Sequence, residues 1–238
     1  MTWSIIARDA ASGAFGVAIA TRFFAVGALC PHAESGVGAL STQALVNPHY
    51  GGQALELLRS GVPAPEAVKR LLAPDEGREH RQLHVIDAQG RIGQFTGAQC
   101  VDWCGAIHGN GFSVAGNMLA NERVIRETAR AYEHGKASFP EKLIAALVAG
   151  EAAGGDKRGK QAAALLICTT EDYAALSLRV DDHAEPIAEL RRLYEKAQER
   201  FVPYLGCSPS KARPWGIFDR DQIEREIQNF QKARGRSS

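Results

Sequence analysis

The sequence predicts an α+β protein in which antiparallel sheets are covered by helices. Two patterns lead to this fold class: the predicted strands follow one another as hairpins, and the predicted helices come in separated pairs. Length is a third observation, because 238 residues suit one large domain better than two small ones. We therefore expect a main domain over residues 1–201, with a linker and a C-terminal amphipathic helix in residues 202–238.

The first hairpin begins at the N-terminus. Apolar residues at alternate positions favour a strand over residues 3–8, residues 9–13 are rich in turn formers, and residues 14–20 favour a return strand. Thr21 and Arg22 end the return strand. The hairpin therefore places this polar pair near the level of the first residue of the chain.

A buried strand and two helices come next. Residues 36–41 are small and apolar, which favours a third strand, and Thr42 and Gln43 close it with polar groups. The helix predicted over residues 53–60 is stopped by a glycine, and the helix over residues 65–72 begins at a proline and ends before another. If strand ends gather on one side of the sheet, Gln43 lies in the same cleft as Thr21 and Arg22.

The same order repeats in the rest of the chain. Residues 82–87 and 91–96 predict a tight hairpin, and residues 100–107 and 112–115 predict another. The remaining predicted elements are helices at residues 122–132 and 140–150, strands at residues 162–168 and 173–180, and helices after Asp182 and at residues 219–233. Ile223, Ile227 and Phe230 give the last helix one apolar face, so we expect a homodimer. The alternative is a monomer in which this helix folds back on its own chain.

Thr2 is the candidate nucleophile. It follows Met1 directly, and a side chain this small allows an aminopeptidase to remove the methionine. A terminal threonine carries a hydroxyl nucleophile and an α-amine of pKa about 8 that can serve as its general base. The alternative is that Thr2 has no catalytic role, as in many chains that begin Met-Thr. Ser4 is a rival hydroxyl on the same strand face, but it lacks an α-amine.

Seven segments carry a resemblance to a known family: residues 2–9, 26–27, 81–82, 116–119, 154–159, 179–183 and 189–193. Together they resemble a bacterial family of uncharacterised proteins, domain of unknown function 1028 (DUF1028), over residue 2 to about residue 195. That family is assigned to the N-terminal-nucleophile hydrolases, whose chains open with a nucleophile-bearing strand and return along a small-residue strand. The resemblance implies a four-layer αββα sandwich of antiparallel sheets and amidohydrolase chemistry.

Asn117 is a second candidate catalytic residue. In amidohydrolases of this superfamily a polar side chain or a backbone amide often supplies the oxyanion hole, and the Asn117 side chain has the chemistry for it. The sequence leaves an alternative open, because Asn117 follows a predicted strand and precedes a predicted helix. It could equally be a turn residue or a helix cap.

A glycine-rich loop at residues 154–161 holds two further candidates. Its spacing matches a phosphate-binding loop, but Gln161 stands where that loop needs a hydroxyl for magnesium, and a strand follows instead of a helix. We therefore expect no nucleotide site and assign Asp156 and Arg158 to substrate binding. Arg22 and Arg158 favour an anionic substrate, because guanidinium groups pair with carboxylates. Alternatively, Asp9 or Asp156 pairs with these arginines and pins the turn.

Composition limits the partners. The net charge is +1, with acids and bases interspersed, so neither nucleic acid nor a membrane surface is an expected partner. The five cysteines lack the spacing of a zinc site or a disulfide framework, so we expect no metal and no cofactor. The N-terminus lacks the pattern of a secretory signal, which predicts a cytoplasmic protein.

Two functions remain as alternatives. In the first, the chain is an amidohydrolase: the hydroxyl of Thr2 attacks the amide carbonyl of a small, anionic substrate, the α-amine takes the proton, and water releases the acyl group. In the second, the sandwich is a non-catalytic ligand-binding or scaffolding protein. A chain that retained Met1 would have no free amine on Thr2, and this outcome would favour the second function.

Overall fold

The computed structural model describes residues 2–235. It contains two compact units, one that ends at Leu190 and one that begins at Arg191, so the division falls within helix α5 (Pro186–Glu199). The domain boundary predicted at residue 201 stays a prediction. Within the described residues, every helix is too short or too polar to cross a membrane.

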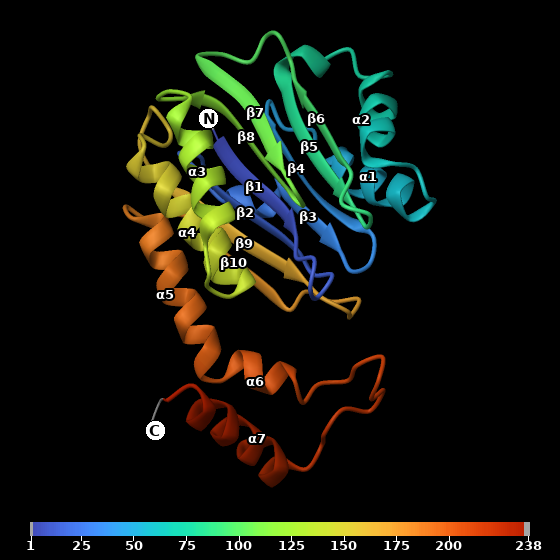
Figure 1. Cartoon of the computed structure of the whole chain (residues 1–238), viewed down its shortest axis with the longest axis vertical. Helices are drawn as coiled ribbons and strands as arrows, with labels where there is room; N and C mark the ends of the chain where they lie inside the picture. Colours follow the sequence, from blue (N-terminus) through green and yellow to red (C-terminus); the bar gives the residue numbers. More distant parts are fainter. Residues whose placement is uncertain (1, 236–238) are drawn as a thin grey trace. The chain divides into compact units, whose positions relative to one another are not determined.

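The first unit contains two antiparallel sheets (Figure 1). The six-stranded sheet has the order β10-β9-β2-β1-β8-β7, with bounds β10 Leu176–Val180, β9 Ala162–Cys168, β2 Phe15–Thr21, β1 Thr2–Arg8, β8 Phe112–Leu119 and β7 Trp103–Gly109. The four-stranded sheet has the order β3-β4-β5-β6, with bounds β3 Pro31–Glu34, β4 Gly38–Ala44, β5 Arg81–Asp87 and β6 Ile92–Thr96. Every strand pair is antiparallel, as the hairpin pattern predicts.

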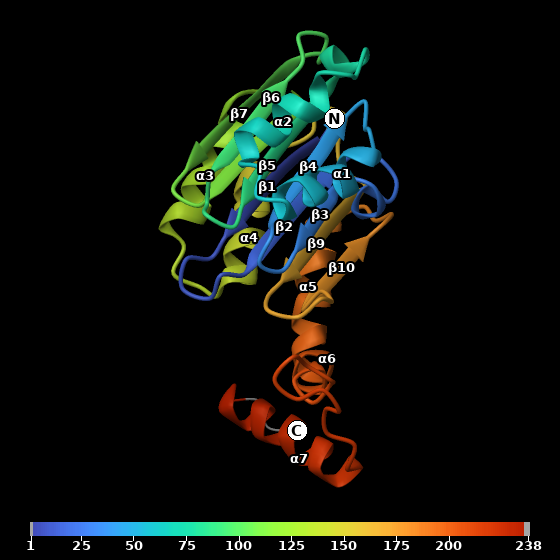
Figure 2. The ribbon, with the colours of Figure 1, turned by 90° about the vertical axis from the view of Figure 1, so that its right-hand side faces the viewer.

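Helices cover the outer faces of both sheets. Helices α3 (Arg123–His134) and α4 (Phe139–Ala152) pack on the six-stranded sheet, and helices α1 (His49–Arg59) and α2 (Ala64–Leu72) pack on the four-stranded sheet. Figure 2 shows α1 and α2 in front of β4 and β5, with the six-stranded sheet behind them. The two sheets face each other through β1, β4, β5 and β8. The predicted α+β class and its αββα layers are therefore confirmed.

Strand β1 lies in the interior of its sheet, between β2 and β8. Its side chains alternate between two environments, as a strand requires. Trp3 packs against Gly150 of α4, whereas Ile6 packs against residues of the four-stranded sheet. Thr2 and Ser4 lie on the same face as Ile6, so both hydroxyls point between the two sheets.

The space between the sheets is apolar at one end and polar at the other. The apolar end contains Ile6, Phe15, Val17, Ala39 and Ile86. The polar end contains buried Ser, Thr, Gln, His and Asn side chains: Thr2, Ser4, Ser41, Gln43, Gln82, His84, Ser113 and Asn117. Burying these groups is costly unless they are hydrogen-bonded to one another, so this end of the interior is a hydrogen-bonded network.

Several strand boundaries differ from the sequence-based expectation, and the largest differences concern β8 and β3. Strand β8 continues to Leu119, past the predicted end at residue 115, so Asn117 is a strand residue and neither a turn residue nor a helix cap. Strand β3 is absent from the prediction because it has only four half-buried residues. At the end of β8, Met118 adopts a left-handed backbone with φ 52° and its amide donates to the Val101 carbonyl. The composition of this segment suggests a turn, but the pairing of Asn117 with Thr2 keeps it in the sheet.

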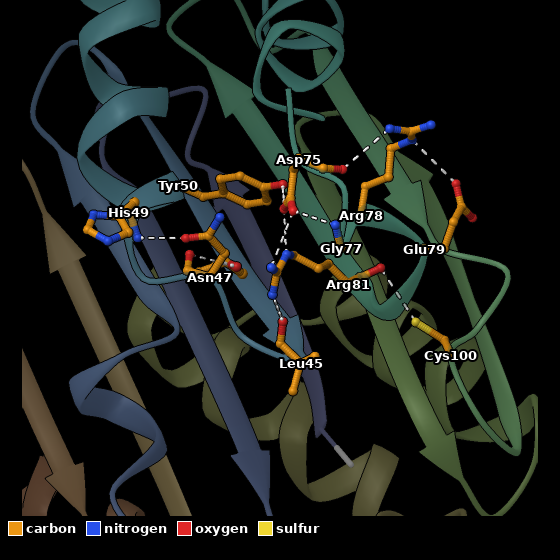
Figure 3. Close-up of polar contacts among 11 residues, drawn as sticks. Leu45, Asn47, His49, Tyr50, Asp75, Gly77, Arg78, Glu79, Arg81 and Cys100 are labelled. Atoms are coloured by element: carbon orange, nitrogen blue, oxygen red, sulfur yellow. Dashed lines mark hydrogen bonds and ion pairs between the residues drawn. The ribbon is translucent and has the colours of Figure 1, made fainter. Parts of the chain in front are cut away.

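A charged cluster ties α1 to the start of β5 (Figure 3). The carboxylate of Asp75 accepts hydrogen bonds from the Tyr50 hydroxyl, from the Gly77 amide at 2.8 Å and from Arg81 Nε at 2.5 Å. Arg81 Nη1 also donates to the Leu45 carbonyl at 2.6 Å. Hydrogen bonding from Arg81 lowers the pKa of the Asp75 carboxyl, and burial beside that carboxylate raises the pKa of Tyr50 to about 12. The cluster fixes the residue that directly precedes Gln82.

The second unit is helical. Helix α6 (Phe201–Leu205) packs against helix α7 (Arg220–Ala233), and an ion pair joins Arg200 to Glu224. Asp219 caps α7 by accepting hydrogen bonds from the amides of Asp221 and Gln222. Ile227 on the predicted apolar face of α7 is buried. Part of that face is therefore covered within the chain itself.

Candidate active site

Thr2 begins β1 and is held from both sides. Its partner in β8 is Asn117, and its hydroxyl donates a 3.1 Å hydrogen bond to the hydroxyl of Thr21 at the end of β2. Both threonines are buried. Three of the residues predicted for the site, Thr2, Thr21 and Asn117, therefore meet at one edge of the polar network.

The glycine-rich loop lies against the same edge. The carboxylate of Asp156 accepts the amide of Arg22 at 2.7 Å, and Asp156 pairs with Leu119 at the end of β8. The Asp156 side chain is fully buried. Although 134 residues separate Arg22 from Asp156, this hydrogen bond joins the loop to the end of the first hairpin.

The two arginines differ in their partners. Arg158 donates to Asp156 through its amide at 2.8 Å and through Nε and Nη2 at 3.4 and 3.3 Å. This is the arrangement of the alternative in which an Asp-Arg pair pins the turn. The side chain of Arg22 is exposed and donates to the main-chain oxygen of Arg158 at 2.6 Å, without a carboxylate partner among residues 2–235. Arg22 therefore retains donors for an anion.

A cavity of about 80 Å³ adjoins Thr21 and Asp156. Its lining also includes Trp3, Glu151 and Lys160. Lys160 Nζ donates to Glu185 at 2.6 Å and lies 3.4 Å from Glu151. Sequence reasoning missed Glu151 and Lys160, because a charged residue in a helix or a loop gives no sign that it faces a cavity.

Gln82 joins two other predicted residues. Its Oε1 accepts hydrogen bonds from Gln43 Nε2 at 2.7 Å and from Asn117 Nδ2 at 3.0 Å. Gln43 also accepts a 2.7 Å hydrogen bond from the Ser4 hydroxyl. The structure thus places Gln43 in the network between the sheets, two hydrogen bonds from Asn117, and not in the cavity that Thr21 lines.

His84 continues the network on the other side of Ser4. Its Nε2 lies 2.8 Å from the Ser4 hydroxyl, and its Nδ1 lies 2.8 Å from the Ser113 hydroxyl. The imidazole is fully buried, and burial lowers its pKa to about 3. His84 is therefore neutral at physiological pH.

The direction of the hydrogen bonds identifies the tautomer of His84. Because Gln43 Oε1 can only accept, the proton of the Ser4 hydroxyl points to Gln43. Ser4 then accepts from His84, so the ring carries its proton on Nε2 and accepts from Ser113 on Nδ1. In this arrangement His84 presents an N–H to Ser4 and cannot act as its base.

Gln82 and His84 were missed as functional candidates by sequence reasoning. One signal was present in the sequence. Gln82 and His84 occupy alternate positions of a strand, and the residues that follow each of them, Leu83 and Val85, are apolar. Two polar residues on one face of a buried strand indicate a polar layer. The sequence does not show that this face meets β1 and β8, since the pairing of the two sheets is a tertiary property.

Comparison with known proteins identifies the family. A family model described as a family of unknown function, DUF1028, matches residues 2–190. The chain belongs to the DUF1028 family. The match confirms the family resemblance and ends at the residue that closes the first unit.

One solved structure agrees with the family assignment. The crystal structure of SPO2555 from Silicibacter pomeroyi, a DUF1028 protein, is 31% identical and has a TM-score of 0.86, covering 92% of this chain and 96% of that chain. Anbu (ancestral beta-subunit) from Yersinia bercovieri is 12% identical with a TM-score of 0.40, covering 82% of this chain and 94% of its own. The Anbu Gly-1 mutant from Hyphomicrobium sp. strain MC1 is 12% identical with a TM-score of 0.38, covering 83% and 96%.

Both Anbu scores are too low to support a statement about this chain. No curated protein matches the sequence. For DUF1028, a function must therefore be argued from the site.

Proposed function

We propose that this DUF1028 protein is an N-terminal-nucleophile amidohydrolase, with Thr2 as the nucleophile after Met1 is removed. The observation that carries the proposal is the position of Thr2. It begins an interior strand, its hydroxyl is hydrogen-bonded to Thr21, and Thr21 lines the adjoining cavity. Once Met1 is removed, Thr2 carries both the hydroxyl nucleophile and the α-amine that serves as its base.

The reaction would have two steps. The Thr2 oxygen attacks the amide carbonyl while the α-amine takes the hydroxyl proton, and the amine leaving group departs with a proton to leave an acyl-enzyme. Water then attacks the ester carbonyl, and Thr2 regains its hydroxyl. The 3.1 Å hydrogen bond to Thr21 would hold the Thr2 oxygen in place before the attack.

The network argues against Ser4 as the nucleophile. Its hydroxyl is fully buried and donates to Gln43, and the neighbouring His84 offers it a proton instead of a lone pair. A nucleophile needs both access and a base. Mature Thr2 would carry its own base in the α-amine, which makes it the better candidate.

The proposed substrate is small and carries an anionic group. The cavity of about 80 Å³ admits only a small group. Arg22 is the residue proposed to bind the anion, since Arg158 is already paired with Asp156. If an anionic substrate is identified, Arg22→Gln should raise KM at least tenfold with little change in kcat, and Arg158→Lys should have a smaller effect. Equal KM values for wild type and Arg22→Gln would remove Arg22 from the binding site.

The nucleophile is tested with the wild type, three variants and a library of small amides. Mass spectrometry of the purified wild type should show a mature chain without Met1. Thr2→Ala should abolish hydrolysis without lowering the thermal midpoint, and Thr2→Ser should retain part of the activity because it keeps a hydroxyl beside the amine. Ser4→Ala is the matched control, with hydrolysis retained. Hydrolysis by Thr2→Ala, or by a chain with a blocked N-terminus, would refute the proposal.

A non-catalytic ligand-binding protein is the second candidate. The small cavity and the internal Asp156–Arg158 pair favour it. Calorimetry and the mass of the N-terminus separate the two functions. A wild-type chain that retains Met1 and binds an anionic ligand without turnover would support binding alone.

A further inference from the structure

The orientation of Gln82 is determined by atoms that can only accept hydrogen bonds. Its Nε2 lies 2.8 Å from the Gly116 carbonyl oxygen and 3.2 Å from the Gly105 carbonyl oxygen. An amide rotated by 180° would place oxygen against both carbonyls. The side-chain nitrogen of Gln82 must therefore face β7 and β8, and its Oε1 must face the other way.

The orientation of Asn117 follows from that of Gln82. Gln82 Oε1 lies 3.0 Å from Asn117 Nδ2, so the nitrogen of the Asn117 side chain must face Gln82. Asn117 Oδ1 then points away from Gln82. This oxygen is buried and has no hydrogen-bond partner within residues 2–235. A buried acceptor without a donor is rare in folded proteins and indicates an absent partner.

Thr2 is the residue directly opposite Asn117 in the antiparallel pairing of β1 and β8. Residues opposite each other in such a pair have Cα atoms about 4.5–5.5 Å apart. A mature Thr2 would carry an α-amine with more hydrogens than a peptide N–H. The chemistry and the pairing position therefore match the acceptor that Asn117 offers.

We propose that Asn117 Oδ1 accepts a hydrogen bond from the α-amine of mature Thr2, and that Gln82 is the positioning residue that holds Asn117 in this orientation. This inference rests on the proposed function and changes the role predicted for Asn117. An oxyanion hole needs N–H donors. Because Asn117 presents its oxygen to Thr2, it orients the catalytic base instead of stabilising the oxyanion.

The test measures the pKa of the Thr2 α-amine and needs no substrate. The full chain is labelled with ¹⁵N-threonine, and the α-amine resonance is followed against pH. Asn117→Asp should raise the α-amine pKa by about one pH unit or more, because a negative neighbour favours the ammonium form. Asn117→Leu should lower it. Gln82→Met should also lower it, because the Asn117 side chain is then free to rotate.

Gln94→Met is the matched control. Gln94 belongs to the same layer and donates to the Ile107 carbonyl and the Ser113 hydroxyl, but it does not contact Asn117. Its substitution should leave the α-amine pKa unchanged. If Gln82→Met does not fold, Asn117→Asp and Asn117→Leu together still test the hydrogen bond to the α-amine.

The outcomes separate this inference from the proposed function. An α-amine pKa that is the same in wild type and Asn117→Asp overturns the inference while Thr2 keeps its catalytic role. Hydrolysis by Thr2→Ala overturns the proposed function while the pKa shifts stand. A wild-type chain that retains Met1 overturns both, because the amine does not exist.

Discussion

The imidazole of His84 should make the stability of the protein depend on pH. Its pKa is about 3 in the folded chain and 6.5 in an ordinary environment, so the unfolded chain binds the extra proton between these values. Stability is therefore complete above pH 6.5 and falls as the pH decreases toward 3. The slope from this residue should approach 1.4 kcal/mol per pH unit, a rough value.

The measurement is denaturant unfolding from pH 7 to pH 4 for wild type and His84→Gln. The variant should be less stable at pH 7 and should show a weaker pH dependence below pH 6. If stability changed with pH to the same extent in the wild type and in His84→Gln, the assignment of a neutral, buried imidazole would be contradicted.

Site residues could be predicted from the sequence only where the chain itself brings them together. Thr2, Thr21 and Arg22 were identified because a local hairpin sets their positions. The residues that surround them come from β5 and β8, and their roles depend on hydrogen bonds such as that of Asn117 to Gln82. Buried polar residues must form hydrogen bonds with one another. The residue pattern along one strand does not show which strand of the other sheet that strand faces.

At the scale of elements, glycine positions show how closely helix α2 approaches β6. A Cβ on Gly93 would lie 2.5 Å from the main-chain oxygen of Ala64, at the start of α2. Gly93→Ala should therefore force the helix away from the sheet and destabilise the protein by about 1–3 kcal/mol. Thermal unfolding of the purified variant checks this value.

Gly52→Ala is a control that should change the stability in the opposite direction. It lies in α1, and a Cβ there would meet no atom within 4 Å. Gly52→Ala should stabilise the protein by about 0.5–1 kcal/mol, since alanine loses less backbone entropy in a helix. A gain in stability from Gly93→Ala would show that α2 packs more loosely than described.

Element types were predicted better than element ends. Apolar and alternating stretches identified β1, β2 and β9, whose residues are almost all buried, and an apolar face identified α4. The end of β8 was not predictable, because glycine, asparagine and a left-handed Met118 suggest a turn while pairing with Thr2 keeps the chain in the sheet. Tertiary pairing overrides local preference at this position.

At the scale of the whole molecule, the expected homodimer requires an exposed apolar surface other than the Ile227 face of α7. Ile227 is buried, but Trp215 and Phe218 are 84% and 86% exposed on the connection between α6 and α7. We predict that these aromatic side chains form the contact with a second copy, because large exposed apolar groups mark interaction sites.

Light scattering at micromolar concentration tests the dimer. The wild type should give twice the chain mass of 25.6 kDa, and the double variant Trp215→Ser, Phe218→Ser should give the mass of one chain. Leu45→Ser, at a side chain 61% exposed in the first unit, is the control and should not change the mass. A wild type with the mass of one chain would contradict the prediction.

If Met1 is removed as proposed, the interior position of β1 limits when in the cell that removal can occur. Strand β8 is synthesised about a hundred residues after Thr2, and its docking completes the burial of that residue. An aminopeptidase needs an extended, accessible terminus, so methionine excision should occur on the nascent chain, before the ribosome has released β8 to fold. Rapid overexpression would then trap an unprocessed form that the same enzyme cannot correct later. Added aminopeptidase should leave this form intact when folded and cleave it when unfolded in denaturant, and cleavage of the folded form would show that the first strand opens after synthesis.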